Sequence, residues 1–269
     1  MDKKGFSEKA GIFLSCKIEK YASKEMIMND HALVRLVSGT STIVQADKIY
    51  TFGPGDTILV PRNQLGRVTK YPADGQPYKA ILIYFTQDFL QKYFAAHPPG
   101  RAPQKTPAIK IFDTHPLVES LFASILPYFT FSDVLPADIA AIKMEEAITI
   151  LRAIDKGTDN ILGQFEDPGK IDLVDFMEKN YMFNLPMEKF GYLTGRSLTT
   201  FKRDFKKAFD TTPQKWLTTK RLELAHHHIV EKKKKPSDIY IEVGFENLSH
   251  FSYAFKKRFG YNPTSAGLL

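Results

Sequence analysis

The sequence contains a single cysteine, Cys16, in 269 residues. One cysteine excludes an internal disulfide framework and any zinc finger built from cysteines, and we expect it to be a small buried apolar side chain. No apolar run approaches the ~18 residues that a membrane span needs. The start of the chain also lacks the apolar core of a signal peptide. We therefore expect a cytoplasmic protein without a membrane partner.

Charge of one sign is not strongly in excess, since 37 basic and 30 acidic residues give a net charge of +7. Residues 1–165 carry 19 basic and 17 acidic side chains, whereas residues 166–269 carry 18 and 13. An excess in the second part is compatible with a polyanionic partner, although many enzymes are equally basic. At roughly 100–200 residues per domain, the length predicts two compact domains.

The first hundred residues predict short strands separated by turns. Apolar and β-branched segments typical of strands cover residues 12–18, 32–37, 42–45, 48–52, 57–61 and 78–85. Their close spacing predicts an antiparallel barrel or sandwich. Helices are expected over residues 86–96, 116–130 and 137–155.

The third of these helices carries an apolar stripe along one face. Its members recur at spacings of three and four residues: Ala140, Met144, Ala147, Leu151 and Ile154. The stripe can pack on the strands of its own chain, or it can form a surface for self-association. We expect a homodimer and assign its contact to this stripe.

A polar stretch from Asp155 to Gly169 predicts the domain boundary, with one domain over 1–160 and a second, all-α domain over 161–269. The second domain contains two similar blocks, about 50 residues apart. In each block three phenylalanines recur every four residues, which predicts an amphipathic helix: Phe201, Phe205 and Phe209, then Phe251, Phe255 and Phe259. A shorter helix and a glycine-containing turn precede each one, as in a helix-turn-helix.

Several motifs of the second domain resemble those of the AraC/XylS family of bacterial transcription regulators. They are Arg221-Leu222-Glu223-Leu224-Ala225, Val243-Gly244-Phe245 and Phe259-Gly260-Tyr261-Asn262-Pro263, and the resemblance covers about residues 170–265. It implies two helix-turn-helix subdomains joined by a long helix, here from Pro213 to about Glu231. It also implies that two recognition helices enter successive major-groove segments on one face of double-stranded DNA, about one turn (~34 Å) apart. An activator that contacts RNA polymerase is the function implied.

The first domain resembles the cupin-type regulatory domain of that family through Gly55-Asp56-Thr57-Ile58-Leu59-Val60-Pro61. The resemblance implies a cupin-like β-barrel with flanking helices, and so an α+β protein. Cupin enzymes hold a metal through a His-x-His pair, which is missing among His31, His97 and His115. We therefore predict no metal, no cofactor and no enzymatic activity; a cupin-type oxygenase or isomerase is the alternative. A small-molecule effector and a protein partner both stay open.

The resemblance and the amphipathic pattern together give a set of candidate DNA-binding residues. They are Thr199, Thr200, Lys202, Arg203, Lys206, Lys207, Asn247, Ser249, His250, Ser252, Tyr253 and Lys256. Arg203 is the candidate for base reading, because the arginine fork matches the two major-groove acceptors of guanine. Lys206 and Lys207 are expected to contribute affinity for the phosphate backbone. Asn247 has a second interpretation, as a helix cap.

Two polar runs have competing interpretations. The consecutive residues His226, His227 and His228 cannot converge on one metal ion, because neighbouring helical residues point ~100° apart. We expect packed or solvent-facing histidines. The four lysines of 232–235 are either a solvated turn or a contact to DNA phosphates.

Overall fold

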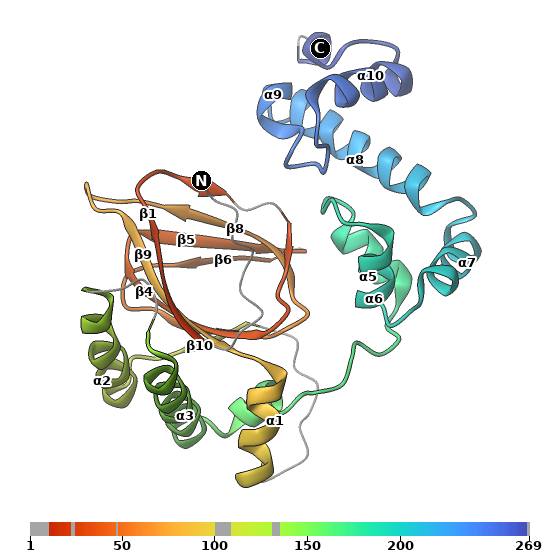
Figure 1. The fold of residues 1–269 in the computed structure, drawn as a ribbon. Coiled ribbons are helices and arrows are strands. Elements are labelled where there is room, and N and C mark those ends of the chain that lie inside the picture. Colours follow the sequence, from red (N-terminus) through yellow and green to blue (C-terminus); the bar gives the residue numbers. More distant parts are fainter. Residues whose placement is uncertain (1–10, 23–24, 47, 100–108, 131–134, 268–269) are drawn as a thin grey trace. The chain divides into compact units, whose positions relative to one another are not determined.

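The computed structural model describes residues 11–22, 25–46, 48–99, 109–130 and 135–267 (Figure 1). The chain divides into two compact units, an N-terminal unit that ends at Glu166 and a C-terminal unit that begins at Asp167. No helix in these ranges is long and apolar enough to cross a bilayer.

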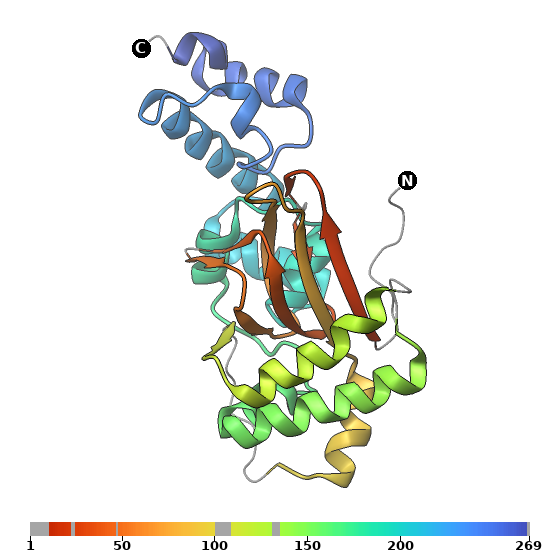
Figure 2. The same ribbon diagram turned by 90° about the vertical axis from the view of Figure 1, so that its left-hand side faces the viewer.

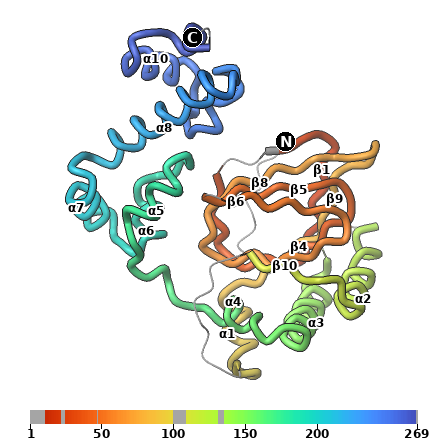
Figure 3. The backbone as a smooth tube through the Cα atoms, turned by 180° about the vertical axis from the view of Figure 1, so that it is seen from behind, coloured from red at the N-terminus to blue at the C-terminus, as the bar shows by residue number. Residues whose placement is uncertain are grey.

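The N-terminal unit is built on two antiparallel sheets. The first has the order β1 (Gly11–Lys17), β9 (Tyr78–Phe85), β4 (His31–Ser38), β7 (Thr57–Val60) and β10 (Lys110–Phe112). The second has the order β2 (Tyr21–Ala22), β8 (Leu65–Tyr71), β5 (Thr40–Gln45) and β6 (Lys48–Phe52), and β3 (Met26–Ile27) pairs with β8. Figure 3 shows the strands arranged around a common interior.

The two sheets pack face to face but do not join into one closed barrel. Side chains of the first sheet, such as Leu36 and Ile58, share an apolar cluster with Ile43 and Phe52 of the second. Within the described ranges, strand pairing stays inside each sheet. Of the two arrangements expected for the strands, a barrel or a sandwich, the described residues form two facing antiparallel sheets in a mixed α+β unit.

Helices cover the outer face of the first sheet. They are α1 (Gln87–Ala96), α2 (Pro116–Ile125), the 3₁₀ turn Leu126–Thr130, α3 (Ala137–Ile154), the 3₁₀ turn Lys156–Thr158 and α4 (Asp159–Leu162). Figure 2 shows α2 and α3 side by side against the sheet. Alternate residues of β9 face them, so Ile81, Ile83 and Phe85 are fully buried.

The apolar stripe of α3 packs inside this same layer. Met144 and Leu151 belong to the cluster that contains Ile83 and Phe85, with 2% and 1% of their surfaces exposed. Side chains buried by their own chain cannot also meet a second copy, so the assignment of the dimer contact to this stripe is wrong. The other face of α3 carries Ile142, which is 62% exposed.

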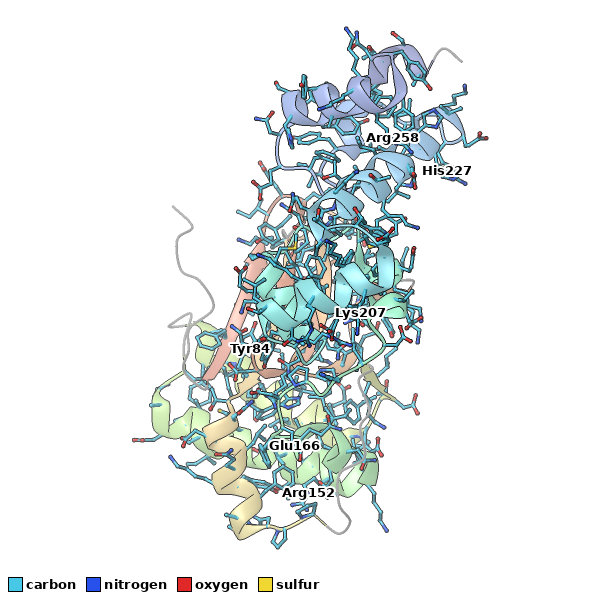
Figure 4. The ribbon with its side chains drawn as sticks, turned by 90° about the vertical axis from the view of Figure 1, so that its right-hand side faces the viewer. Tyr84, Arg152, Glu166, Lys207, His227 and Arg258 are labelled. Atoms are coloured by element: carbon cyan, nitrogen blue, oxygen red, sulfur yellow. The ribbon has the colours of Figure 1, made fainter. Side chains whose placement is uncertain are left out.

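Two arginines stabilise the end of the N-terminal unit through hydrogen bonds to main-chain carbonyls. Arg152 donates to the carbonyls of His97 and Pro98 and pairs with Asp159 at 2.7 Å. Arg62, which is buried, donates to the carbonyls of Gln164 and Glu166. Figure 4 labels Arg152 and Glu166 in this region. The last residues of the unit are thus held by side chains that arise far away in the sequence.

The C-terminal unit is all helical within its described residues. Its helices are α5 (Leu173–Asn180), α6 (Met187–Leu193), α7 (Leu198–Phe209), α8 (Pro213–Val230), α9 (Pro236–Ile239), α10 (Leu248–Phe259) and α11 (Pro263–Ala266). One apolar cluster gathers around Phe201 and Phe205, and another around Phe251 and Phe255. The helix α8 contributes Leu217 to the first cluster and Leu222, Ala225 and Ile229 to the second, so it joins two small cores.

Candidate DNA-binding site

The helix α7 presents one apolar and one polar face. Phe201 and Phe205 are fully buried, and Ser197 caps the helix by accepting a hydrogen bond from the amide of Thr200 at 3.3 Å. Asp210 ends the helix in the left-handed conformation, at φ 51°. Because the phenylalanines fix the rotation of the helix, the polar face points to solvent.

The predicted DNA-binding residues of α7 lie on or beside that polar face. Five of them are exposed to solvent: Thr199, Lys202, Arg203, Lys206 and Lys207. Thr200 is half-buried. The side chain of Arg203 is 68% exposed. Figure 4 labels Lys207 on this helix. The structure thus brings the six residues onto one helix, where a polyanion can reach most of them.

An acidic side chain organises the arginines around α7. Asp204 pairs with Arg196 at 3.2 Å and with Arg203 at 3.3 Å. The hydrogen bond from Arg196, with a further one from Arg203, lowers the pKa of Asp204, so it stays a carboxylate. Arg196 also donates to the carbonyls of Ile171 and Thr194. Asp204 therefore holds the Arg203 guanidinium against the helix while leaving its far edge in solvent.

The turn before α7 depends on glycine. Gly195 has φ +67°, and a Cβ there would lie 2.3 Å from the carbonyl carbon of Gly169. Both the backbone conformation and the close approach exclude a larger residue. Thr194 is buried and donates to the carbonyls of Phe190 and Gly191, which ends α6. This turn sets the angle between α6 and α7.

The helix α10 repeats the arrangement of α7. Phe251 and Phe255 are fully buried, and the predicted residues Ser249, His250, Tyr253 and Lys256 are exposed, with Ser252 half-buried. The Oδ1 atom of Asn247 accepts hydrogen bonds from the amides of Ser249 and His250 at 2.8 and 3.1 Å. Asn247 is thus a helix cap in this structure, which favours the second of its two interpretations.

Arg221, on α8, connects the two helical clusters of the C-terminal unit. Its side chain is largely buried and donates to the carbonyl of Tyr181 at 2.8 Å, of Phe183 at 2.7 Å and of Gly244 at 3.1 Å. The first two carbonyls lie between α5 and α6, and the third lies in the turn before α10. Gly244 has φ +91°, and a Cβ there would lie 2.7 Å from the Nε atom of Arg221. The arginine therefore fixes both units to one helix.

A second contact crosses between the units. Asn184 donates to the carboxylate of Glu246 at 2.7 Å. Sequence reasoning found Arg221 only as part of a motif and did not find the roles of Arg196 or Asn184. Their partners are main-chain carbonyls and side chains up to 62 residues away, which no local pattern reveals.

The histidine and lysine runs are used in packing and in a surface ion pair. His226 bonds to the hydroxyl of Tyr261 at 2.8 Å and stacks on Phe255. His227 is exposed. Lys234 pairs with Glu242 at 3.0 Å. Within the part of the chain that the structure describes, no three His, Cys, Asp or Glu side chains are placed to hold a metal.

One expectation outside this site is wrong. Cys16, expected to be buried, is exposed. It lies between the polar residues Ser15 and Lys17 near the end of β1, and β1 is an edge strand of its sheet, so solvent reaches the side chain.

Comparison with known proteins gives two family matches and several relatives. Residues 193–266 match a helix-turn-helix domain family, and residues 31–159 match the family of the ExsA N-terminal regulatory domain. The HTH-type transcriptional regulator ExsA of Pseudomonas aeruginosa is 25% identical over 232 residues, 85% of this chain and 83% of that protein. The virulence regulon transcriptional activator VirF of Yersinia enterocolitica is 28% identical over 187 residues, 68% and 69% of the two chains. Among solved structures, ToxT from Vibrio cholerae covers 97% of both chains at 13% identity, with a TM-score of 0.43.

Proposed function

Because this chain belongs to the AraC/XylS family of transcription regulators, we propose that it binds double-stranded DNA in a sequence-specific way through α7 and α10. The observation that carries the proposal is the repeated unit of the C-terminal half. Two basic, solvent-facing helices each follow a glycine turn, and α8 and Arg221 hold them in one arrangement. Two such helices can enter successive major-groove segments on one face of the duplex.

Within α7, Arg203 reads bases and the lysines bind the backbone. The exposed guanidinium of Arg203 can form a bidentate pair with guanine, and the carboxylate of Asp204 orients it before DNA arrives. Lys206 and Lys207 lie in the last turn, where a groove-bound helix rises toward the phosphates. Within α10 the corresponding groups are Ser249, His250, Ser252, Tyr253 and Lys256.

Activation of transcription, with RNA polymerase as a partner, is the direction of regulation that we infer. The support is the name of VirF, a transcriptional activator, together with the family to which this chain belongs. In this scheme the protein binds beside a promoter, and its regulatory unit controls whether the bound form is active.

The N-terminal unit is proposed to be a cupin-like domain that regulates the DNA-binding unit and pairs two copies of the chain. Its match to the ExsA N-terminal regulatory domain family supports the regulatory role. We assign the homodimer contact to the outward faces of α3 and α2. Ile142 is exposed on the first face, and Leu117 is 49% exposed on the second. The regulating signal is either a small molecule or a partner protein.

Selection of DNA by the isolated C-terminal unit tests the proposal. A fragment of residues 167–269 carries both helical cores and should fold by itself. From a randomised library it should enrich a sequence with two conserved patches, and its affinity should fall steeply as salt rises. Enrichment of no sequence, or binding that does not change between 50 and 200 mM salt, would contradict the proposal.

A further inference from the structure

The helices α7 and α10 correspond to each other residue by residue. Each has 12 residues after a capping side chain, and each buries a phenylalanine at its fourth and its eighth position. The two helices are therefore rotated alike on their cores, and equivalent residues lie at the same place on the exposed face. Arg203, the base-reading candidate of α7, has Tyr253 as its equivalent in α10. The side chain of Arg203 is 68% exposed and Tyr253 is 68% exposed, so both are open to a ligand.

The exposed face of α10 lacks the side chains that read guanine and adenine best. Its first two turns, residues 248–254, contain no arginine, lysine, asparagine or glutamine. Arginine and lysine are the usual partners of the two guanine acceptors, and asparagine and glutamine are those of adenine. The basic residues Lys256, Lys257 and Arg258 are all in the last turn, where a groove-bound helix rises toward the phosphates. The base contacts of α10 therefore differ in kind from those of α7.

The other polar groups at the start of α10 have structural partners or little selectivity. Asn247 caps the helix, since its Oδ1 atom accepts hydrogen bonds from two main-chain amides. The ring of His250 lies beside that of Phe245, which is buried, with the ring centres 5.8 Å apart. The two serines of this face carry hydroxyls that can pair with any base and so discriminate weakly. Tyr253 thus presents the largest side chain with which α10 can recognise a base.

A phenol ring offers an apolar surface and one hydroxyl, so it matches the methyl group of thymine better than the paired acceptors of guanine. We propose that α10 specifies an A·T pair by packing the ring of Tyr253 against the C5-methyl group of the thymine. Since α7 carries Arg203 at the equivalent position, the operator has two unlike halves, and the protein binds it in one orientation. The inference rests on the proposed function, because it requires both helices to enter the major groove.

Replacing thymine by uracil tests this contact directly, because uracil pairs with adenine in the same way and lacks only the methyl group. An operator is selected from a randomised library with the full chain, and each of its thymines is then replaced singly by deoxyuridine. One replacement should weaken binding about fourfold, the effect of returning one buried methyl group to water, about 0.8 kcal/mol. That thymine should lie about 10 base pairs from the guanine that is read by Arg203.

The ratio of the affinities for the thymine and uracil operators separates the ring from the rest of the helix. Tyr253→Ala should bring this ratio to about one, whereas Tyr253→Phe keeps the ring and should preserve the ratio. Arg203→Ala is the matched control on α7, and it should weaken binding to both operators while leaving the ratio unchanged. Tyr253→Arg gives α10 the side chain that α7 carries at the equivalent position, so selection with this variant should replace the A·T pair by a G·C pair. Thermal melting checks that each variant is folded.

Several results would overturn the proposal. They are an operator in which no single uracil weakens binding more than about twofold, a folded Tyr253→Ala protein that keeps the ratio, and loss of the ratio in Tyr253→Phe or Arg203→Ala. An unchanged A·T preference in the Tyr253→Arg protein would do the same. Selection that enriches no sequence would refute the proposed function and this inference with it. An enriched operator that is insensitive to uracil refutes this inference alone.

Discussion

Replacing Arg221 by methionine should destabilise the C-terminal unit and loosen the arrangement of its two recognition helices. The substitution leaves three carbonyls, those of Tyr181, Phe183 and Gly244, without their donor. At about 1 kcal/mol for each buried acceptor left unpaired, the free energy of unfolding should fall by about 3 kcal/mol. For a unit of this size the urea midpoint should fall by about 2 M.

The neighbouring Lys220 provides a matched control. It lies on the same helix, and its ion pair with Glu178 is partly exposed, so Lys220→Met should cost less than about 1 kcal/mol. Urea unfolding of the fragment 167–269, followed by circular dichroism, compares the two variants.

The same change should affect DNA recognition. Arg221 joins the segment before α6 to the turn before α10. Without it, binding should become less sensitive to one extra base pair inserted between the two halves of a selected operator. The reasoning is refuted if Arg221→Met and Lys220→Met have the same urea midpoint and the same dependence on operator spacing.

Three further predictions concern other parts of the chain. Arg203→Ala should weaken binding to a selected operator by about 1–3 kcal/mol and relax the preference for one base. Lys207→Ala should weaken binding to operator and random DNA alike and reduce the salt slope by about one. Equal losses for Arg203→Ala on the two DNAs in competition binding would make Arg203 a phosphate contact. Ile142→Glu should yield a folded monomer in sedimentation, whereas Leu151→Glu should unfold the N-terminal unit. A dimeric Ile142→Glu protein would place the interface elsewhere. Burial, with the charge of Arg62, lowers the pKa of His31 to about 3. Below pH 6.5 the unfolded state therefore binds a proton at His31 that the folded state does not bind. The free energy of unfolding should fall by about 2 kcal/mol between pH 7 and pH 5. The variant His31→Asn keeps an acceptor for the amide of Arg62 and should lose that dependence in thermal melts; an unchanged dependence would assign it to other groups.

The helices α7 and α10 were predictable because their signal is local. Phenylalanines every four residues, such as Phe201 and Phe205, fix which face of a helix is buried, and that leaves Arg203 outside. A glycine in each preceding turn marks a position that requires positive φ, as Gly195 and Gly244 show. These features require no knowledge of distant residues.

Strand β8 was not predictable in the same way. Strand β8 was missed because its residues Gly66, Thr69 and Lys70 are neither apolar nor regularly alternating. The strand forms nonetheless, since β5 supplies its partner over Thr40–Val44. The position of Lys70 opposite Ser41 is therefore set by a partner strand that lies almost 30 residues earlier, and not by the residues beside it.

The stripe of α3 shows the limit of amphipathic patterns. A stripe such as Met144 and Leu151 states that a face is apolar, but not whether the covering surface belongs to the same chain. The sheet of the N-terminal unit covers it, because the outward residues of β9 are equally apolar and need a partner. Ile142, isolated on the opposite face, had no periodic signal.

Guanine methylation protection on a selected operator tests the central claim most directly. Dimethyl sulfate modifies guanine N7 in the major groove, the atom that an arginine fork contacts. If α7 and α10 enter successive groove segments, the C-terminal unit should protect two patches about 10 base pairs apart on one face of the duplex. Replacing Arg203 by alanine should remove protection in one patch only. A single protected patch, or protection confined to the minor-groove face of adenines, would contradict the account.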